Sequence, residues 1–179
     1  HWIAIATLIE ENYKTHDGFV VLHGSDTMSY TASALSFMLE NLAKPVILTG
    51  SQLPIGDLRT DAKENLITSI QIAALQNNHT AVVKEVGLYF EYKLYRGNRT
   101  TKINAEHFQA FASLNFPALV TSGVHLKVNH ELLHINYTQA PLVVHKKMDA
   151  TIVLLKLFPG ITPIVLQSIL EIPGLKAVV

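Results

Sequence analysis

The sequence contains no cysteine, and it has no excess of charge of either sign. Without cysteine, the chain can form neither a disulfide framework nor a thiolate metal site, and this composition fits the cytosol. Its 14 Lys and Arg residues balance its 14 Asp and Glu residues, so nothing attracts it generally to nucleic acid or anionic membranes. We therefore expect neither of these as a partner.

Long hydrophobic runs are also absent, since no stretch approaches the roughly 20 apolar residues that span a bilayer. Apolar residues nevertheless make up 49% of the 179 residues, which allows a substantial core in one domain, or in one domain and the start of another. An uncapped amphipathic pattern begins at Trp2, and an apolar run continues to Val179. We expect that further sequence precedes and follows the chain.

Strand-like and helix-like segments alternate over the first 90 residues. Residues 18–23, 45–49 and 86–90 are short apolar runs typical of strands buried on both faces. One helix is predicted between each pair. The first is expected to bury Ala32, Leu35, Leu39 and Leu42, and the second to bury Leu66, Ile70 and Ala73. This order predicts an α/β fold with a mainly parallel sheet flanked by helices, a flavodoxin-like large domain.

Capping signals place the start of the second helix at Asp61, with Glu64 as its capping-box partner. Arg59 is expected to pair with Asp61 across the preceding loop. Residues 123–144 alternate in short runs that indicate an antiparallel ribbon.

The chain turns polar at residues 145–149, which predicts one domain over residues 1–148 and the start of a smaller α/β domain over residues 149–179. In the latter, residues 151–158 are predicted to form a buried strand. Thr162 and Pro163 are predicted to begin a helix.

Ligands of open parallel sheets bind at the carboxyl ends of the strands. The segment Gly24-Ser25-Asp26-Thr27 lies at such an end, before a helix. A backbone amide there can receive an anion or oxyanion, Ser25 offers a hydroxyl, and Asp26 can hold an ammonium group. Ser, Asp and Thr are also the best helix-capping residues, so capping is the better explanation of the tetrapeptide taken alone.

A basic cluster, residues 96–102, directly follows the third predicted strand. A lysine acts as a base only where burial or nearby positive charge lowers its pKa. If Lys102 folds onto Ser25, hydroxyl, amine and carboxylate form a relay that can deprotonate a nucleophile. A solvated basic loop or a phosphate grip is the alternative.

His125, His130 and His134 are candidate metal ligands, but on strands this spacing does not bring the imidazoles together. We expect no metal and no cofactor.

Several blocks resemble the L-asparaginases, and specifically the type I branch of bacterial cytoplasmic enzymes. The first is His-Gly-Ser-Asp-Thr-Met at residues 23–28. The others are residues 30–39, 49–54, 96–102 and 155–160. The resemblance implies hydrolysis of L-asparagine to L-aspartate and ammonia through an acyl-enzyme on a threonine near the family's N-terminus. It also implies a cytoplasmic homodimer or homotetramer.

The resemblance places a second catalytic centre on Ser25, Asp26 and Lys102, with Asp26 binding the substrate ammonium. It places Gly24 and Ser51 on substrate-lining loops. Ser25 stands where the family usually has threonine, and the Gly-Gly-Thr-Ile segment with the primary threonine is absent from these residues. We therefore expect the 179 residues alone to be inactive. Two alternatives stay open: the asparaginase-like subunit of a glutamyl-tRNA amidotransferase, and a non-catalytic amino-acid sensor.

Overall fold

The computed structural model describes residues 1–135 and 140–179. Its contacts divide the chain into two units, His1–Lys146 and Lys147–Val179, each described by itself. This division falls two residues before the predicted domain boundary.

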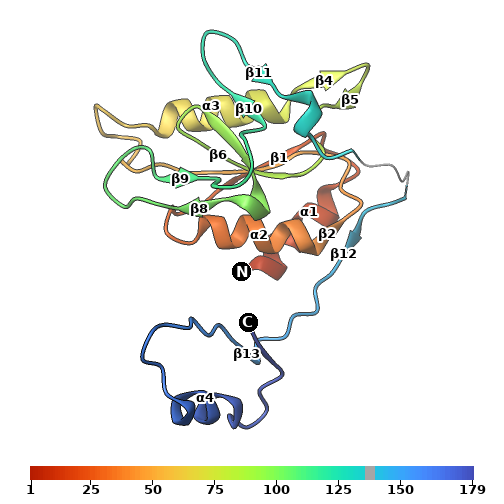
Figure 1. The fold of residues 1–179 in the computed structure, drawn as a ribbon. Helices are drawn as coiled ribbons and strands as arrows, with labels where there is room; N and C mark the ends of the chain where they lie inside the picture. Colours follow the sequence, from red (N-terminus) through yellow and green to blue (C-terminus); the bar gives the residue numbers. More distant parts are fainter. Residues whose placement is uncertain (136–139) are drawn as a thin grey trace. The chain divides into compact units, whose positions relative to one another are not determined.

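The first unit is built on a mixed sheet with a parallel core (Figure 1). Among the described residues the sheet has six strands in the order β1-β3-β6-β7-β10-β11. These are β1 (Phe19–Leu22), β3 (Val46–Thr49), β6 (Val86–Phe90), β7 (Lys93–Arg96), β10 (Val120–Thr121) and β11 (Lys127–Val128). The first three are parallel and the others antiparallel to their neighbours. The predicted α/β class with a mainly parallel core is confirmed.

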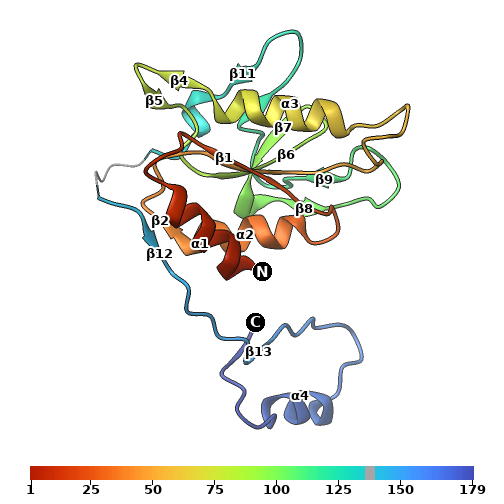
Figure 2. The ribbon, with the colours of Figure 1, turned by 180° about the vertical axis from the view of Figure 1, so that it is seen from behind.

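Helices cover both faces of the sheet, as Figures 1 and 2 show. They are α1 (Trp2–Asn12), α2 (Met28–Met38) and α3 (Ala62–Ala73). Successive strand residues point to opposite faces, so Val46 and Leu48 pack in the cluster with α1 and α2, while Ile47 packs with Ile72 of α3. Burial on both faces accounts for the continuous apolar runs of β3 and β6. The edge strand β1 is only partly covered, contrary to expectation.

Two predicted helices differ from those observed. The first ends at Met38, so the buried residues Leu39 and Leu42 lie beyond it, with Leu39 in β2 (Leu39–Glu40). The strand β2 pairs with β12 (Val143–Val144). This pairing would be lost if helix α2 continued through Leu39 and Glu40. In the second, Ile70 is 52% exposed, because α3 turns a polar face inward. The residues that it buries are Asn65, Thr68, Ser69 and Ile72.

The basic cluster does not directly follow the third strand, as the sequence suggested. Glu91 and Tyr92, both with positive φ, make a tight turn after β6, and β7 runs back along it. The chain then continues through η1 (Gly97–Arg99) into β8 (Thr101–Lys102), which pairs with β9 (Phe111–Ala112). The turn carries no Asn-Gly or Asp-Gly signal, which is why the sequence did not reveal it.

The remaining elements are short. β4 (Gln76–Asn77) pairs with β5 (Thr80–Ala81), and η2 (His130–Leu132) follows β11. The ribbon expected over 123–144 is not formed as predicted among the described residues. There β11 pairs antiparallel with β10, which precedes this range, and β12 pairs with β2, while residues 124–126 and 133–135 form no strand. Residues 136–139 of the expected ribbon lie outside the described residues.

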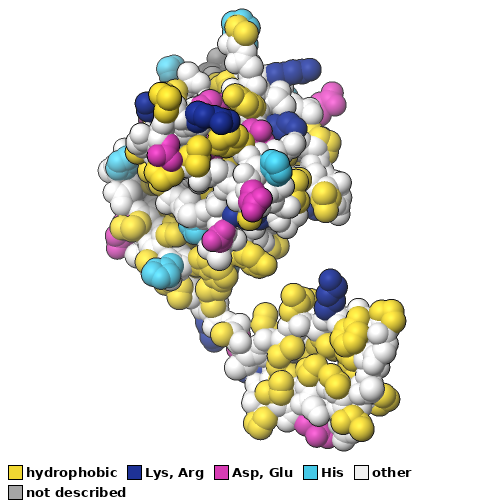
Figure 3. Space-filling view, turned by 90° about the vertical axis from the view of Figure 1, so that its left-hand side faces the viewer, with side chains coloured by type: hydrophobic (Ala, Val, Ile, Leu, Met, Phe, Trp, Pro, Cys, Tyr) yellow, Lys and Arg dark blue, Asp and Glu magenta, His cyan; other side chains and the backbone are white. Residues whose placement is uncertain are grey.

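The unit Lys147–Val179 contains β13 (Ile152–Val153), α4 (Pro163–Leu170) and β14 (Ala177–Val178), with β13 and β14 parallel. Helix α4 begins as predicted, after Thr162 and with proline in its first turn. The predicted buried strand over 151–158 is wrong: only two residues are in β13, and Leu154 and Phe158 are exposed. Nothing in this unit is buried, and Figure 3 shows hydrophobic side chains across its visible face. No helix in the described part of either unit is long and apolar enough to cross a membrane.

Candidate active site

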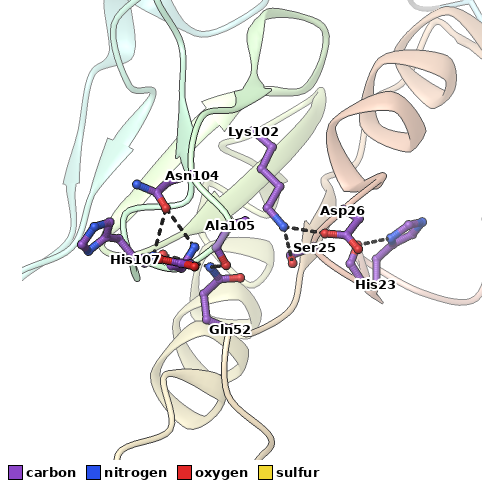
Figure 4. A network of polar contacts seen from close by, with 10 residues as sticks. His23, Ser25, Asp26, Gln52, Lys102, Asn104, Ala105 and His107 are labelled. Carbon is purple, nitrogen blue, oxygen red and sulfur yellow. Dashed lines mark hydrogen bonds and ion pairs between the residues drawn. The ribbon is translucent and has the colours of Figure 1, made fainter.

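Lys102 bridges the two segments that the sequence singled out. Its Nζ donates to Ser25 Oγ over 3.0 Å and to Asp26 Oδ1 over 2.7 Å (Figure 4). Lys102 ends β8, whereas Ser25 and Asp26 lie between β1 and α2. Hydroxyl, amine and carboxylate thus meet at the carboxyl ends of the parallel strands, where such sheets bind ligands.

The contact is asymmetric in exposure. The side chain of Lys102 is 16% exposed and that of Asp26 is 91% exposed. The hydrogen bond from Lys102, and then its charge, hold the pKa of Asp26 below its ordinary value of 3.8. Asp26 is therefore an ionised carboxylate open to solvent, available to a cation that approaches from outside.

A second loop meets the first where the adjacent strands β1 and β3 end together, at the pair Leu22 and Thr49. The N–H of His23 extends the pairing by donating to Thr49 O over 2.8 Å. At Gly50 a Cβ atom would lie 2.2 Å from the carbonyl oxygen of His23, so only glycine permits this approach. Ser51 follows directly and is half-buried.

Asp61 holds this second loop instead of capping α3. Its carboxylate accepts hydrogen bonds from the backbone N–H groups of Gln52 and Leu53, at 3.0 to 3.1 Å. The predicted capping box is therefore wrong, because the loop amides use the carboxylate and Asp61 makes no capping hydrogen bond. The first N–H of the helix, that of Ala62, donates to Thr60 Oγ1 instead. The partners of the Asp61 carboxylate in this loop are therefore the Gln52 and Leu53 amides, and not Arg59 as predicted. Glu64 instead accepts from Tyr89 Oη over 2.6 Å. Burial, and then this contact, raise the pKa of Tyr89.

Asn65 and Gln52 connect the loops further, and the sequence did not indicate either role. Asn65 donates to Gly50 O and to Asp61 Oδ2, and its Oδ1 accepts from the N–H of Glu91. Gln52 Nε2 donates to the carbonyl oxygens of Ala105 and His107, in the segment after Lys102 (Figure 4). The four-residue spacing of Asp61 and Asn65 on one helix face was the available signal for Asn65.

The expected proximity of Lys102, Ser25 and Asp26 is present, and Gly24 and Ser51 lie in the two adjoining loops. Their roles in catalysis and substrate binding remain predictions. Within residues 1–135 and 140–179, no group of three or more His, Asp or Glu side chains is arranged to hold a metal.

A mixed sheet with a parallel core, flanked by helices and with polar loops at its carboxyl edge, defines an α/β protein. Sheets of this kind bind ligands at that edge. Residues 1–134 match the family model "Asparaginase, N-terminal", so the chain belongs to the asparaginase family. L-asparaginase 1 of Escherichia coli K12 is 46% identical over 177 residues, covering 96% of this chain and 49% of the relative. The crystal structure of L-asparaginase I from Vibrio cholerae matches with a TM-score of 0.88 at 41% identity, covering 99% of this chain and 52% of that one.

Relatives with other names share the same region. The 60 kDa lysophospholipase of Mus musculus is 47% identical over 178 residues, covering 99% of this chain and 30% of the relative. A glutamyl-tRNA(Gln) amidotransferase subunit of Pyrococcus abyssi is 33% identical over 184 residues, covering 100% of this chain and 41% of the relative. The chain thus spans half or less of the length of these curated relatives.

Proposed function

We propose that this chain is part of an L-asparaginase that hydrolyses L-asparagine to L-aspartate and ammonia through an acyl-enzyme on a hydroxyl nucleophile. The observation that carries the proposal is the 3.0 Å contact between Lys102 Nζ and Ser25 Oγ beside Asp26. Ser25 and Lys102 move protons, Asp26 holds the substrate ammonium, and Gly24 and Ser51 line the substrate. General acid–base help of this kind is typically worth about 10²–10⁴ in rate.

The ion pair of Lys102 with Asp26 suggests how substrate binding prepares the base. A substrate ammonium at the exposed carboxylate of Asp26 would place a second cation beside Lys102. Repulsion between the two cations favours release of a proton from the lysine. Ser25 Oγ, already in hydrogen-bond contact with the amine, then has an acceptor for its own proton.

We place the primary nucleophile, a threonine, on a further parallel strand that precedes α1. The edge strand β1 has no neighbour on its outer side among the described residues, and Leu22 is 65% exposed there. An apolar hollow of about 400 Å³ lies between α1 and β1, lined by Ile5, Leu8, Ile9, Asn12, His16 and residues 19–22. A right-handed crossover through α1 would bring the preceding strand to this edge, with its carboxyl end beside Ser25.

The assignment of residues 149–179 as the start of a smaller α/β domain is part of this proposal. So are the assembly and the cellular compartment of the protein. We expect a cytoplasmic homodimer or homotetramer that acts on free L-asparagine, with glutamine as a poorer substrate and with no cofactor. Sedimentation of the full-length protein as a monomer would count against the oligomer.

Two other functions are distinguished by what they need. An amidotransferase component would copurify with a kinase-like partner and turn over only with charged tRNA. A sensor would bind the amino acid without releasing ammonia, and its parent sequence would have no threonine on the strand before α1.

The direct test is ammonia release from L-asparagine and L-glutamine by the full-length protein, with the 179-residue chain as a matched sample. We expect turnover by the former, faster with asparagine, and none by the latter. Turnover of lysophosphatidylcholine without ammonia release from asparagine would overturn the proposal.

A further inference from the structure

A line of hydrogen bonds runs from helix α1 to the Gly24-Ser25 peptide. The indole N–H of Trp2 donates to Thr31 Oγ1 over 2.9 Å. Thr31 Oγ1 lies 2.9 Å from His23 Nε2, and His23 Nδ1 lies 2.7 Å from the carbonyl oxygen of Gly24. The catalytic scheme above gives no role to His23 or to this line.

The partners of His23 determine which ring nitrogen carries the proton. The Gly24 carbonyl is only an acceptor, so a 2.7 Å contact requires a proton on Nδ1. The indole of Trp2 is only a donor and uses a lone pair of the Thr31 oxygen, so the Thr31 hydroxyl can direct its proton to Nε2. Thr31 is only 1% exposed, so its side of this line is shielded from solvent. A proton on Nδ1 and a free lone pair on Nε2 are therefore the arrangement of His23 that matches these partners.

Side-chain crowding does not fix the orientation of the peptide that His23 contacts. Nothing lies within 4 Å of a Cβ built on Gly24, and glycine tolerates both orientations of an adjoining peptide plane. In a trans peptide, the carbonyl of Gly24 and the N–H of Ser25 point in opposite directions. In Figure 4 Ser25 and Asp26 lie between His23 and Lys102. A carbonyl held toward His23 therefore turns the Ser25 N–H away from His23, toward the side of Lys102.

We propose that His23 is a positioning residue: by donating from Nδ1 to Gly24 O, it fixes the Gly24-Ser25 peptide so that the Ser25 N–H faces the substrate in front of Lys102. The inference deepens the proposed function and rests on it for the identity of the substrate. The Ser25 N–H donates to no acceptor in the described part of the chain, so it is available to an oxygen on which negative charge develops.

Two substitutions separate the two ends of the imidazole. His23→Asn places an amide nitrogen at the position of Nδ1 and keeps the donor to Gly24 O, while losing the contact with Thr31. His23→Gln places its terminal amide at the position of Nε2, keeps an acceptor for Thr31, and loses the donor to Gly24 O. Crystal structures of both variants of the full-length protein show the orientation of the Gly24 carbonyl. Nitrogen-15 NMR of histidine-labelled wild-type protein reports the tautomer, with the His23 signal identified by its loss in either variant.

We expect the Nδ1-protonated tautomer, a Gly24 carbonyl that keeps its direction in His23→Asn, and a rotated peptide in His23→Gln. With asparagine, kcat should fall at least about tenfold in His23→Gln and less than about threefold in His23→Asn, since one oxyanion donor is worth up to about 10²–10³. KM should change less than kcat, because Asp26 is untouched.

An Nε2-protonated tautomer, an unmoved carbonyl in His23→Gln, or equal losses of kcat in both variants would overturn the inference. If wild-type protein releases no ammonia from asparagine, the proposed function fails. The tautomer and the peptide orientation then still decide the role of His23.

Discussion

The carbonyl oxygen of His23 occupies the space in which residue 50 would carry a side chain, 2.2 Å from an ideal Cβ. The contact joins the loops after β1 and β3, and Met28 Cε closes the same space at 2.8 Å. Gly24, in the facing loop, has nothing within 4 Å of such a Cβ. The fold thus requires glycine at position 50, where a side chain would collide with the backbone. At position 24 we propose that the substrate requires glycine, because a side chain would enter the space that the substrate occupies.

Alanine substitutions should separate these reasons. Gly50→Ala should lower the free energy of unfolding by about 3 kcal/mol, because a backbone oxygen cannot move aside easily. Gly24→Ala should change it by less than about 0.5 kcal/mol, yet reduce asparagine turnover by the full-length protein at least about tenfold, because its methyl group enters substrate space. Urea unfolding and ammonia release measure the two effects. A fully active Gly24→Ala protein would remove Gly24 from the substrate-lining set.

Replacing Lys102 should greatly slow turnover without unfolding the protein. Lys102→Met removes the amine that contacts Ser25, and kcat should fall by about 10²–10⁴ in the full-length protein. Lys127→Met, on the exposed end of β11, is the matched control and should keep full activity. If Lys102→Met retains more than about a tenth of the wild-type rate, the amine is not the base.

The acid titration of Asp26 should depend on Lys102. Because contact with Lys102 lowers the pKa of Asp26 in the folded protein, this carboxylate contributes stability that is present above the unfolded pKa. The contribution is lost as the pH falls through the lower, folded pKa. Carbon-13 NMR of the Asp26 carboxyl should show a midpoint below 3.8 in the wild type and an upward shift in Lys102→Met. Lys127→Met should leave the midpoint where it is, and an unchanged midpoint in Lys102→Met would contradict the assigned cause.

Asn65 should be important for stability despite its position beside a surface loop. The residue is 1% exposed, and Asn65→Ala leaves the carbonyl of Gly50 and the N–H of Glu91 without a partner. Each unpaired buried group costs about 1–3 kcal/mol, so we expect a loss of about 2–4 kcal/mol in urea unfolding. Asn115→Ala, at an exposed position, should cost less than about 0.5 kcal/mol. Equal losses at the two positions would show that the loop is not tied through Asn65.

The ion pair of Glu85 and Arg96 should behave as a buried pair. Arg96 Nε donates to Glu85 over 2.6 Å, and the same carboxylate accepts the N–H of His134. Glu85→Leu should lower the free energy of unfolding by about 3 kcal/mol, because it leaves the Arg96 guanidinium without its carboxylate partner. The double variant with Arg96→Met should be less destabilised than the sum of the single changes, whereas full additivity in urea unfolding would show that the pair is uncoupled.

The sequence predicted the strands buried on both faces and the proximity of Lys102 to Ser25. Those strands carry continuous apolar runs, and β6 was predicted with its observed bounds. The sequence did not predict the turn at Glu91 and Tyr92, because both residues adopt positive φ although neither is glycine or asparagine. Propensity has no information on such a turn when tertiary packing imposes it.

The polar connections of the site were also beyond the sequence. The pattern at Asp61 and Glu64 was that of a capping box, but both carboxylates have partners from other parts of the chain. Asn65, Gln52 and His23 bond to backbone groups, and residue type does not reveal a backbone partner. The spacing of Asp61 and Asn65 indicated only the contact between those two side chains.

The contact of Lys102 with Ser25 closes a separation of 77 residues, and the paired strands β3, β6 and β7 lie between the two residues along the chain. We expect these strands to pair before the amine reaches the hydroxyl. Contacts of such long range carry a high loop-closure entropy and form late during folding. The same separation makes the site a reporter of completed folding, because a partly assembled sheet can hold its apolar core while the amine and the hydroxyl are still apart.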